Sequence, residues 1–377
     1  MYCASIFGTV VLSASLGSPS HLAAAAPELK EVQNLKLPEL QSVTSVVVSS
    51  DGKFAYTASF AANTICTFIR DPATGQLDLI DTISDHPALS SVVNFCLSKD
   101  EKFAAASAFG SNALTLFKRD PETGGLSIVD AAYESAGPNR GLNFVVAACF
   151  SPSADFIYTG CSVGVGVYEI KGDKLQFVQS TDADGKLSGV RGVALSPNGE
   201  WVYATAMTSG NLAVFRRDAN SGLVSAAQVL SNAESGTKSL NGAFHCAVSA
   251  DGKFVYVNSG RFRGDQAVSA FTVAEDGQLK VLQEFVNGTG EFTEFQGGNS
   301  LALTPNGKSL VALATLSDRL FRFERDVPSG RLTFVGSHLV GQVVQPGSAG
   351  LCFSPDGRFL YVADEAASAI VVYEMPQ

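Results

Sequence analysis

Residues 354–364, SPDGRFLYVAD, decide the fold, because related copies of this stretch occur along the whole chain. Each copy follows a short apolar run and precedes a run in which side-chain character alternates. Five copies carry Asp-Gly or Asn-Gly between the two runs, and these dipeptides are typical of β-hairpin turns. The seven copies are 45 to 55 residues apart and begin at Ser49, Ser98, Ser151, Ser196, Ser249, Thr304 and Ser354.

A second turn signal follows in each of four repeats, where an Arg-Asp pair precedes a glycine. The aspartate can accept a hydrogen bond from the backbone two residues further on, and the glycine can adopt a positive φ. The sequences KGDKL and AEDGQL take the same place in two other repeats. Each repeat is therefore predicted to run strand, turn, strand, loop, strand, turn, strand. The four arginines are Arg70, Arg119, Arg217 and Arg325.

A four-stranded sheet of this kind has an apolar face that it cannot bury alone, so the copies must stack around an axis. The sequence predicts an all-β fold, a seven-bladed β-propeller with four antiparallel strands per blade. The last repeat ends near Pro376 after three strands, whereas LKEVQNLKLP from Leu29 predicts a strand with no blade of its own. We expect this N-terminal strand to complete the C-terminal blade and close the ring.

The innermost strands carry a small residue two positions before the Ser or Thr of each repeat, as expected where seven strands crowd toward an axis. The chain has seven cysteines without close pairs, which predicts free, buried thiols rather than a disulfide framework. Three of these cysteines belong to the axial set, which is Val47, Cys96, Cys149, Ala194, Ala247, Ala302 and Cys352.

Composition limits the class of protein. Residues 28–377 are predicted to form one propeller domain, and residues 1–27 a signal or targeting segment or, alternatively, an extension. The net charge of −10 disfavours a nucleic-acid partner. No later stretch approaches the ~20 apolar residues of a membrane span. We expect a monomer that has a small-molecule substrate and no membrane partner, and leave cytoplasmic and secreted locations open.

The repeat SPDGRFLYVAD, combined with a strand and the turn RDPETG, resembles the seven-bladed propeller lactonases, the family of bacterial 6-phosphogluconolactonase and the fungal 3-carboxymuconate lactonising enzyme. The resemblance spans residues 29–377. It implies hydrolysis of a small sugar- or organic-acid lactone, or the reverse lactonising cyclisation, in an axial pocket. The family often has Pro-Arg-His where an innermost strand begins. Here Val190-Arg191-Gly192 keeps only the arginine and Ala243-Phe244-His245 only the histidine, which leaves the substrate open.

The predicted site lies on the face with the long, variable loops, because loops on a rigid scaffold commonly carry function. Arginine side chains there could grip a carboxylate and stabilise an oxyanion, and a histidine could move the proton. The predicted catalytic residues are His245, Arg191 and Glu294, and the predicted substrate-binding residues are Arg261, Arg263, Glu291 and Asn299.

Other interpretations of these residues remain open. His245 could be a hydrogen-bonded core residue, Arg191 could belong to a structural ion pair, and the loop residues could be solvated. The propeller could bind a protein or glycan partner without catalysis. No cofactor is predicted, but Ca²⁺ is an alternative that would make the protein a metal-dependent hydrolase or isomerase. Its oxygen ligands would come from Asn94, Asn143 and Asn299 together with Asp364 or Glu365.

Overall fold

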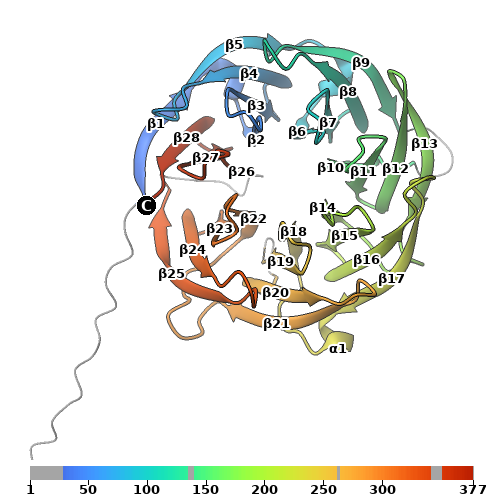
Figure 1. Ribbon diagram of the computed structural model, residues 1–377, viewed down its shortest axis with the longest axis vertical. Coiled ribbons are helices and arrows are strands. Elements are labelled where there is room, and N and C mark those ends of the chain that lie inside the picture. The colour runs from blue at the N-terminus through green and yellow to red at the C-terminus, as the bar shows by residue number, and fades with distance from the viewer. Residues whose placement is uncertain (1–28, 135–139, 261–263, 341–349, 377) are drawn as a thin grey trace, which may run out of the picture.

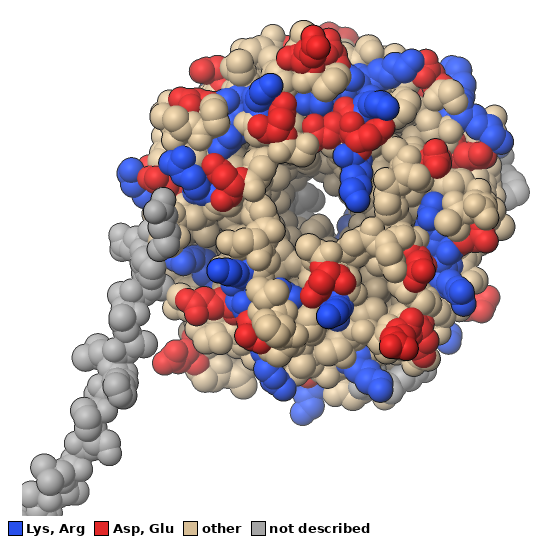
Figure 2. All heavy atoms as spheres, viewed as in Figure 1, with Lys and Arg blue, Asp and Glu red and all other residues tan. Residues whose placement is uncertain are grey.

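The computed structural model describes residues 29–134, 140–260, 264–340 and 350–376. This part of the chain forms seven four-stranded antiparallel sheets, which stand as blades around a central axis (Figure 1). The space-filling view shows an opening at the centre of the ring (Figure 2). The predicted seven-bladed β-propeller is confirmed. The predicted segment 1–27 lies outside the described residues.

The blades follow one another along the chain, and the strands of each blade run in order from the axis to the rim. Blade one contains β2 (Val43–Val48), β3 (Phe54–Ser59), β4 (Thr64–Arg70) and β5 (Leu77–Ile83). Blade two contains β6 (Val92–Leu97), β7 (Phe103–Ala108), β8 (Ala113–Arg119) and β9 (Leu126–Tyr133). Blade three contains β10 (Ala147–Phe150), β11 (Phe156–Cys161), β12 (Gly164–Lys171) and β13 (Lys174–Thr181). Blade four contains β14 (Val190–Leu195), β15 (Trp201–Ala206), β16 (Asn211–Arg217) and β17 (Val224–Ser231).

The remaining blades repeat this arrangement. Blade five contains β18 (Ala243–Val248), β19 (Phe254–Ser259), β20 (Ala267–Val273) and β21 (Leu279–Val286). Blade six contains β22 (Gly298–Leu303), β23 (Ser309–Ala314), β24 (Arg319–Arg325) and β25 (Leu332–Leu339). Blade seven contains β26 (Leu351–Phe353), β27 (Phe359–Asp364), β28 (Ala369–Glu374) and β1 (Lys30–Lys36). Three short helical segments are η1 (Pro38–Leu40), η2 (Pro87–Leu89) and α1 (Asn232–Ser235). No helix of the described residues is long and apolar enough to span a membrane.

The N-terminal strand closes the ring as predicted. β1 is antiparallel to β28, with Glu31 opposite Tyr373 and Lys36 opposite Ala369. The Gln33 side chain also reaches the next blade, where its amide donates to the Leu77 carbonyl at 2.9 Å and accepts from the Leu77 amide at 2.8 Å. The first and last parts of the propeller are therefore joined by backbone and side-chain hydrogen bonds, which leaves β28 without an open edge.

The second strand of each blade is buried along nearly all of its length, and apolar clusters extend across the blade interfaces. In one such cluster, Tyr158 and Val167 of blade three pack with Val202 and Phe215 of blade four. These contacts show why a blade is stable only beside its neighbours.

A polar contact recurs between blades and uses the arginines of the second turn. In the contact between blades five and six, Arg325 Nε donates to the Tyr256 hydroxyl at 2.5 Å and Arg325 Nη1 to the Gly307 carbonyl at 3.0 Å. The hydroxyl donates in turn to the Gly330 carbonyl at 2.8 Å. We call this arrangement the Tyr–Arg contact. It occurs in the pairs Tyr361 and Arg70, Tyr56 and Arg119, Tyr158 and Arg217, and Tyr256 and Arg325.

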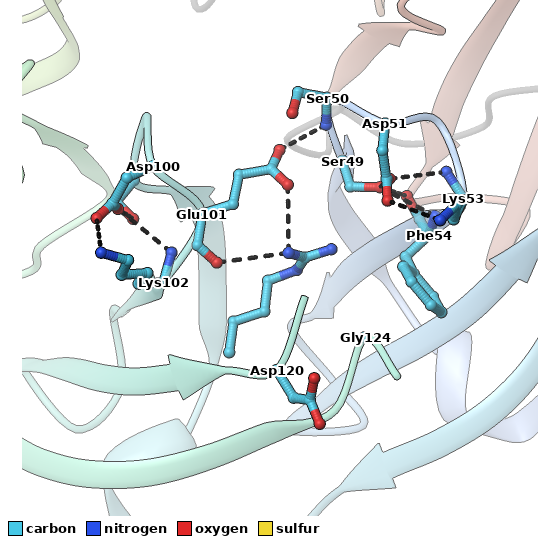
Figure 3. Close-up of polar contacts among 12 residues, drawn as sticks. Ser49, Ser50, Asp51, Lys53, Phe54, Asp100, Glu101, Lys102, Asp120 and Gly124 are labelled. Carbon is cyan, nitrogen blue, oxygen red and sulfur yellow. Dashed lines mark hydrogen bonds and ion pairs between the residues drawn. The ribbon is translucent and has the colours of Figure 1, made fainter. Parts of the chain in front are cut away.

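The contact between blades one and two has an additional carboxylate (Figure 3). Glu101 accepts a hydrogen bond from the Ser50 amide and forms an ion pair with Arg119 at 3.2 Å. Because the Arg119 side chain is fully buried, this carboxylate compensates a cation that has left water.

The cysteines near the axis are free thiols, as predicted, and so are the other cysteines that the structure describes. Burial raises the pKa of Cys96 to about 12 and that of Cys352 to about 11, and it raises the pKa of Cys149 well above the usual value. These thiols therefore stay protonated at neutral pH, which makes them poor nucleophiles.

Candidate functional site

A β-bulge recurs near the start of the innermost strand in five blades and directs side chains toward the axis. In blade four the pairing of β14 with β15 shifts between Val190 and Gly192, so that Arg191 is the bulged residue. In blade five the shift lies between Ala243 and His245. A bulge bends its strand locally and re-aims the neighbouring side chains. In the other three blades with this bulge, the bulged residues of the innermost strands are Thr44, Val93 and Asn299.

The bulges border a cavity of about 350 Å³ at the axis. Each of the seven blades contributes to its lining, mostly through the bulged residue and the residue that follows it. Residues after the second strands of blades one, two and seven complete the wall. The polar side chains of the lining are those of Thr44, Ser45, Asn94, Arg191, His245, Asn299, Ser300 and Glu365.

Arg191 is the only arginine among the described residues of the lining, where Glu365 is the one carboxylate and does not form an ion pair with it. Its side chain forms no ion pair with a described residue, and its buried Nε has no hydrogen-bond partner there. Desolvation lowers the pKa of Arg191 below its usual value. A guanidinium that is partly withdrawn from water without a partner attracts an anion strongly, because pairing would offset the cost of its desolvation.

His245 stands on the neighbouring innermost strand. The His245 backbone amide donates a hydrogen bond to Asn258 Oδ1 at 3.0 Å, so this N–H group beside the bulge has a partner. An added Cβ at Gly192 would lie only 3.1 Å from the His245 Cα, so the glycine allows the two strands to approach closely. The His245 Nδ1 atom is buried without a described partner, and desolvation lowers the pKa of His245 to about 4. The imidazole is therefore neutral at pH 7 and has a lone pair for a proton, but at this pKa it is a weaker base than an ordinary histidine.

The oxygen-bearing residues considered for Ca²⁺ are only partly brought together. Asn94, Asn299 and Glu365 line the cavity, whereas Asn143 accepts a hydrogen bond from Ser162 at 2.7 Å outside the lining. Asn94 Oδ1 accepts a hydrogen bond from the Ala148 backbone amide at 3.2 Å. The described residues contain no group of three or more His, Cys, Asp or Glu side chains that could hold a metal ion. A Ca²⁺ site would therefore depend on amide oxygens and the single carboxylate of Glu365.

The predicted acidic residues lie elsewhere. Glu294 forms an ion pair with Arg319 at 3.1 Å and its side chain is 60% exposed. Glu291 is also exposed, and neither residue lines the cavity. Their predicted convergence with Arg191 and His245 is not seen, because they belong to a loop outside the repeat, and their functional roles stay predictions. Arg261 and Arg263 lie outside the described residues.

The sequence-based prediction missed an aromatic part of the cavity wall. Phe60 and Phe109 line the cavity, and their rings are 6.3 Å apart. The Phe109 ring also packs against that of the exposed Phe144, with the two ring centres 4.8 Å apart. A signal was available, since Phe60 and Phe109 each directly follow the second strand of their blade and so share one position of the repeat with Glu365.

The comparisons with known proteins agree with this architecture. The family model described as "Lactonase, 7-bladed beta-propeller" matches residues 21–146, 147–237 and 224–345. No curated protein sequence matches the chain.

Solved structures with the same fold include proteins of different activities. The periplasmic gluconolactonase of Pseudomonas aeruginosa is 21% identical, with a TM-score of 0.64 over 79% of this chain and 85% of that one. A Bacteroides uniformis protein, provisionally assigned as a 6-phosphogluconolactonase, is 19% identical, with a TM-score of 0.63 over 78% and 85% of the two chains. Hydrazine synthase of Kuenenia stuttgartiensis is 16% identical, with a TM-score of 0.66 over 90% and 97%. At these identities the likeness shows the fold alone. Because the family model covers most of its length, the chain belongs to the seven-bladed β-propeller lactonase family.

Proposed function

We propose that the axial cavity binds a lactone, or the carboxylate that its opening produces, and that the protein hydrolyses the lactone or catalyses the reverse cyclisation. The observation that carries this proposal is the pair formed by Arg191 and His245. A guanidinium that forms no ion pair with a described residue and a neutral imidazole stand on neighbouring innermost strands at one cavity. Membership of the lactonase family supports the reaction class.

In the proposed hydrolysis, Arg191 binds the carbonyl oxygen of the lactone. His245 accepts a proton from a water molecule as the water oxygen forms a bond to the carbonyl carbon. Negative charge develops on the carbonyl oxygen, where the guanidinium stabilises it. The carbonyl is restored as the ring C–O bond breaks, and the proton passes from His245 to the departing ring oxygen. The product is the hydroxy acid, whose carboxylate Arg191 can hold. In the alternative, a lactonising cycloisomerase, Arg191 holds the carboxylate of an unsaturated acid while a carboxylate oxygen bonds to one carbon of the double bond and His245 passes a proton taken from solvent to the other carbon, so that the lactone forms without release of water.

The aromatic part of the wall defines the other end of the proposed substrate. Phe60 and Phe109 offer apolar surface, and among the described lining residues Arg191 is the sole side chain with a fixed positive charge. A highly charged sugar phosphate would find one guanidinium there and one nearby carboxyl, that of Glu365. We therefore favour a lactone with a single anionic or carbonyl pole and an apolar body over a phosphorylated sugar.

The test is turnover of a lactone panel by the full-length protein, with and without a chelator. The panel pairs each sugar lactone with an aryl or alkyl lactone of similar size. Arg191→Met and His245→Gln should each lower kcat/KM by at least about 100-fold, since single oxyanion donors and general bases contribute that much. Arg331→Met is the matched control, because it removes one exposed arginine charge far from the cavity lining.

Equal turnover by the wild type and both cavity variants would refute the proposed roles. Activity that disappears with chelator and returns with Ca²⁺ would favour the metal-dependent alternative. Carboxylate binding without turnover of any lactone would instead favour a binding module, and thermal-shift measurements with simple carboxylates would detect it.

A further inference from the structure

One blade interface keeps half of the Tyr–Arg contact. Blade four has Tyr203 at the tyrosine position, but blade five ends its third strand with Val273 where blades one, two, four and six have arginine. The register shows that the positions correspond, because Val273 donates its amide to the Lys253 carbonyl as Arg325 does to Lys308. The Tyr203 hydroxyl is buried and has no described hydrogen-bond partner.

The other two interfaces without an arginine have lost the tyrosine as well. Blade two has Ala105 at the tyrosine position and faces Ile170 of blade three. Blade six has Val311 and faces Met375 of blade seven. Within the described chain, Tyr203 is thus the one tyrosine of this set that lacks its arginine. A buried hydroxyl without a partner costs free energy, so this interface is less well satisfied than its four counterparts.

A groove of about 550 Å³ borders Val273, the residue at the arginine position, while the Tyr203 hydroxyl lies beneath it and outside its lining. Its lining includes Val273, Trp201 and Gly252. Gly252 corresponds to Gly199 and Gly307, whose carbonyl oxygens accept hydrogen bonds from the arginine Nη1 atoms in two of the existing contacts. The groove is formed by turns after first and third strands, so it opens on the face opposite the axial cavity. An arginine at position 273 would point into it.

An aromatic ring is also in place. In the four existing contacts the guanidinium carbon lies 5.1 to 5.7 Å from the centre of a phenylalanine ring. At the blade four and five interface, Trp201 takes the position of that phenylalanine. It packs against the turn glycine Gly277 as Phe254 packs against Gly330. Tryptophan is the strongest of the aromatic side chains for a cation over its face.

The charges around the groove favour a cation. Glu200, Asp251 and Glu275 line it, against Lys253 as the one basic lining residue described. Burial acts to raise the pKa of Asp251, but hydrogen bonds from the Ser249 hydroxyl and the Lys253 amide lower it below its usual value. Asp251 is therefore ionised at neutral pH.

We propose that this groove between blades four and five binds a guanidinium group from outside the fold, in the position that arginine occupies at the other interfaces. The ligand is a free arginine derivative or an arginine side chain of a polypeptide. The group would lie against Trp201 and the Gly252 carbonyl, near the three carboxylates. This site is separate from the axial cavity and does not depend on the lactonase proposal.

The chain supplies its own reporter, because Trp201 is its only tryptophan. Tryptophan fluorescence of the full-length protein is titrated with N-acetyl-arginine amide and, in parallel, with the neutral isostere N-acetyl-citrulline amide. We expect a saturable change with the arginine compound alone. Gly-Arg-Gly compared with Gly-citrulline-Gly forms a second arm. Tenfold tighter binding of the peptide than of the amide identifies a polypeptide as the source, and equal binding identifies a small molecule.

Val273→Arg should abolish the response, because the protein's own guanidinium then fills the groove, and it should raise the melting temperature. The double variant Glu200→Gln and Glu275→Gln should weaken binding about fivefold through the lost charges, which keeps the test valid if Val273→Arg fails to fold. Identical responses to arginine and citrulline compounds would overturn the proposal. So would unchanged arginine binding in folded Val273→Arg or in the double variant.

Discussion

Removing one hydroxyl should have opposite consequences at two equivalent tyrosines. Tyr256→Phe removes the acceptor of Arg325 Nε and the donor to the Gly330 carbonyl, and both of these groups are at a buried interface. Loss of one charge-assisted and one neutral hydrogen bond with unsatisfied buried partners should lower the free energy of unfolding by about 2–4 kcal/mol. Tyr203→Phe removes a buried hydroxyl that has no described partner, so stability should be unchanged or rise by up to about 1 kcal/mol.

Urea unfolding followed by circular dichroism measures both effects. The two variants differ from wild type by the same atom at the same repeat position, so Tyr203→Phe is the internal control. The dependence of the unfolding free energy on urea should stay constant in both, because the surface exposed on unfolding does not change. Equal destabilisation of the two variants would refute the reasoning that assigns the Tyr–Arg contact to four interfaces only.

Other measurements test separate parts of the structure. Because the pKa of His245 is about 4 in the folded protein against 6.5 for an ordinary histidine, the unfolded chain takes up the proton first. Stability should therefore fall as the pH drops from about 6.5 to about 4, by at most about 3 kcal/mol, and His245→Gln should remove that contribution in urea titrations at each pH. Gln33→Ala should cost about 1–2 kcal/mol and accelerate amide exchange in β1, because its two hydrogen bonds to Leu77 help to close the ring. Finally, Cys96 and Cys149 are half-buried but have raised pKa values, so they should react with a thiol reagent at pH 8 at least about tenfold more slowly than free cysteine, and labelling as fast as that of free cysteine would contradict those pKa values.

The fold was predictable because the repeat carries its signal seven times, so that blade number and ring closure could be inferred together. Arg191 and His245 could be placed at the axis for the same reason, since both have a counted distance from the repeat's serine. Glu291 and Glu294 have no such reference, because their loop lies between repeats and nothing in its pattern determines its path. Loop geometry depends on contacts that become visible only after the chain has folded.

The Tyr–Arg contact escaped prediction for a related reason. Each second-turn arginine was interpreted within its own repeat, where it marks a tight turn. Its tyrosine belongs to the preceding blade, 63 residues away in the case of Tyr56 and Arg119. Comparing positions across consecutive repeats, rather than along one, would have found the pairing and the exception at Tyr203.

The recurring bulge gathers residues from five blades around one central cavity. Some of these residues also hold neighbouring blades together, since the Thr44 hydroxyl donates to the Val93 carbonyl and Asn94 Oδ1 accepts from the Ala148 amide, whereas Arg191 forms no described inter-blade hydrogen bond. A substitution such as Arg191→His would therefore alter the chemistry of the central chamber without removing a described inter-blade hydrogen bond. The ring thus offers a modular template on which new specificities can be engineered one blade at a time.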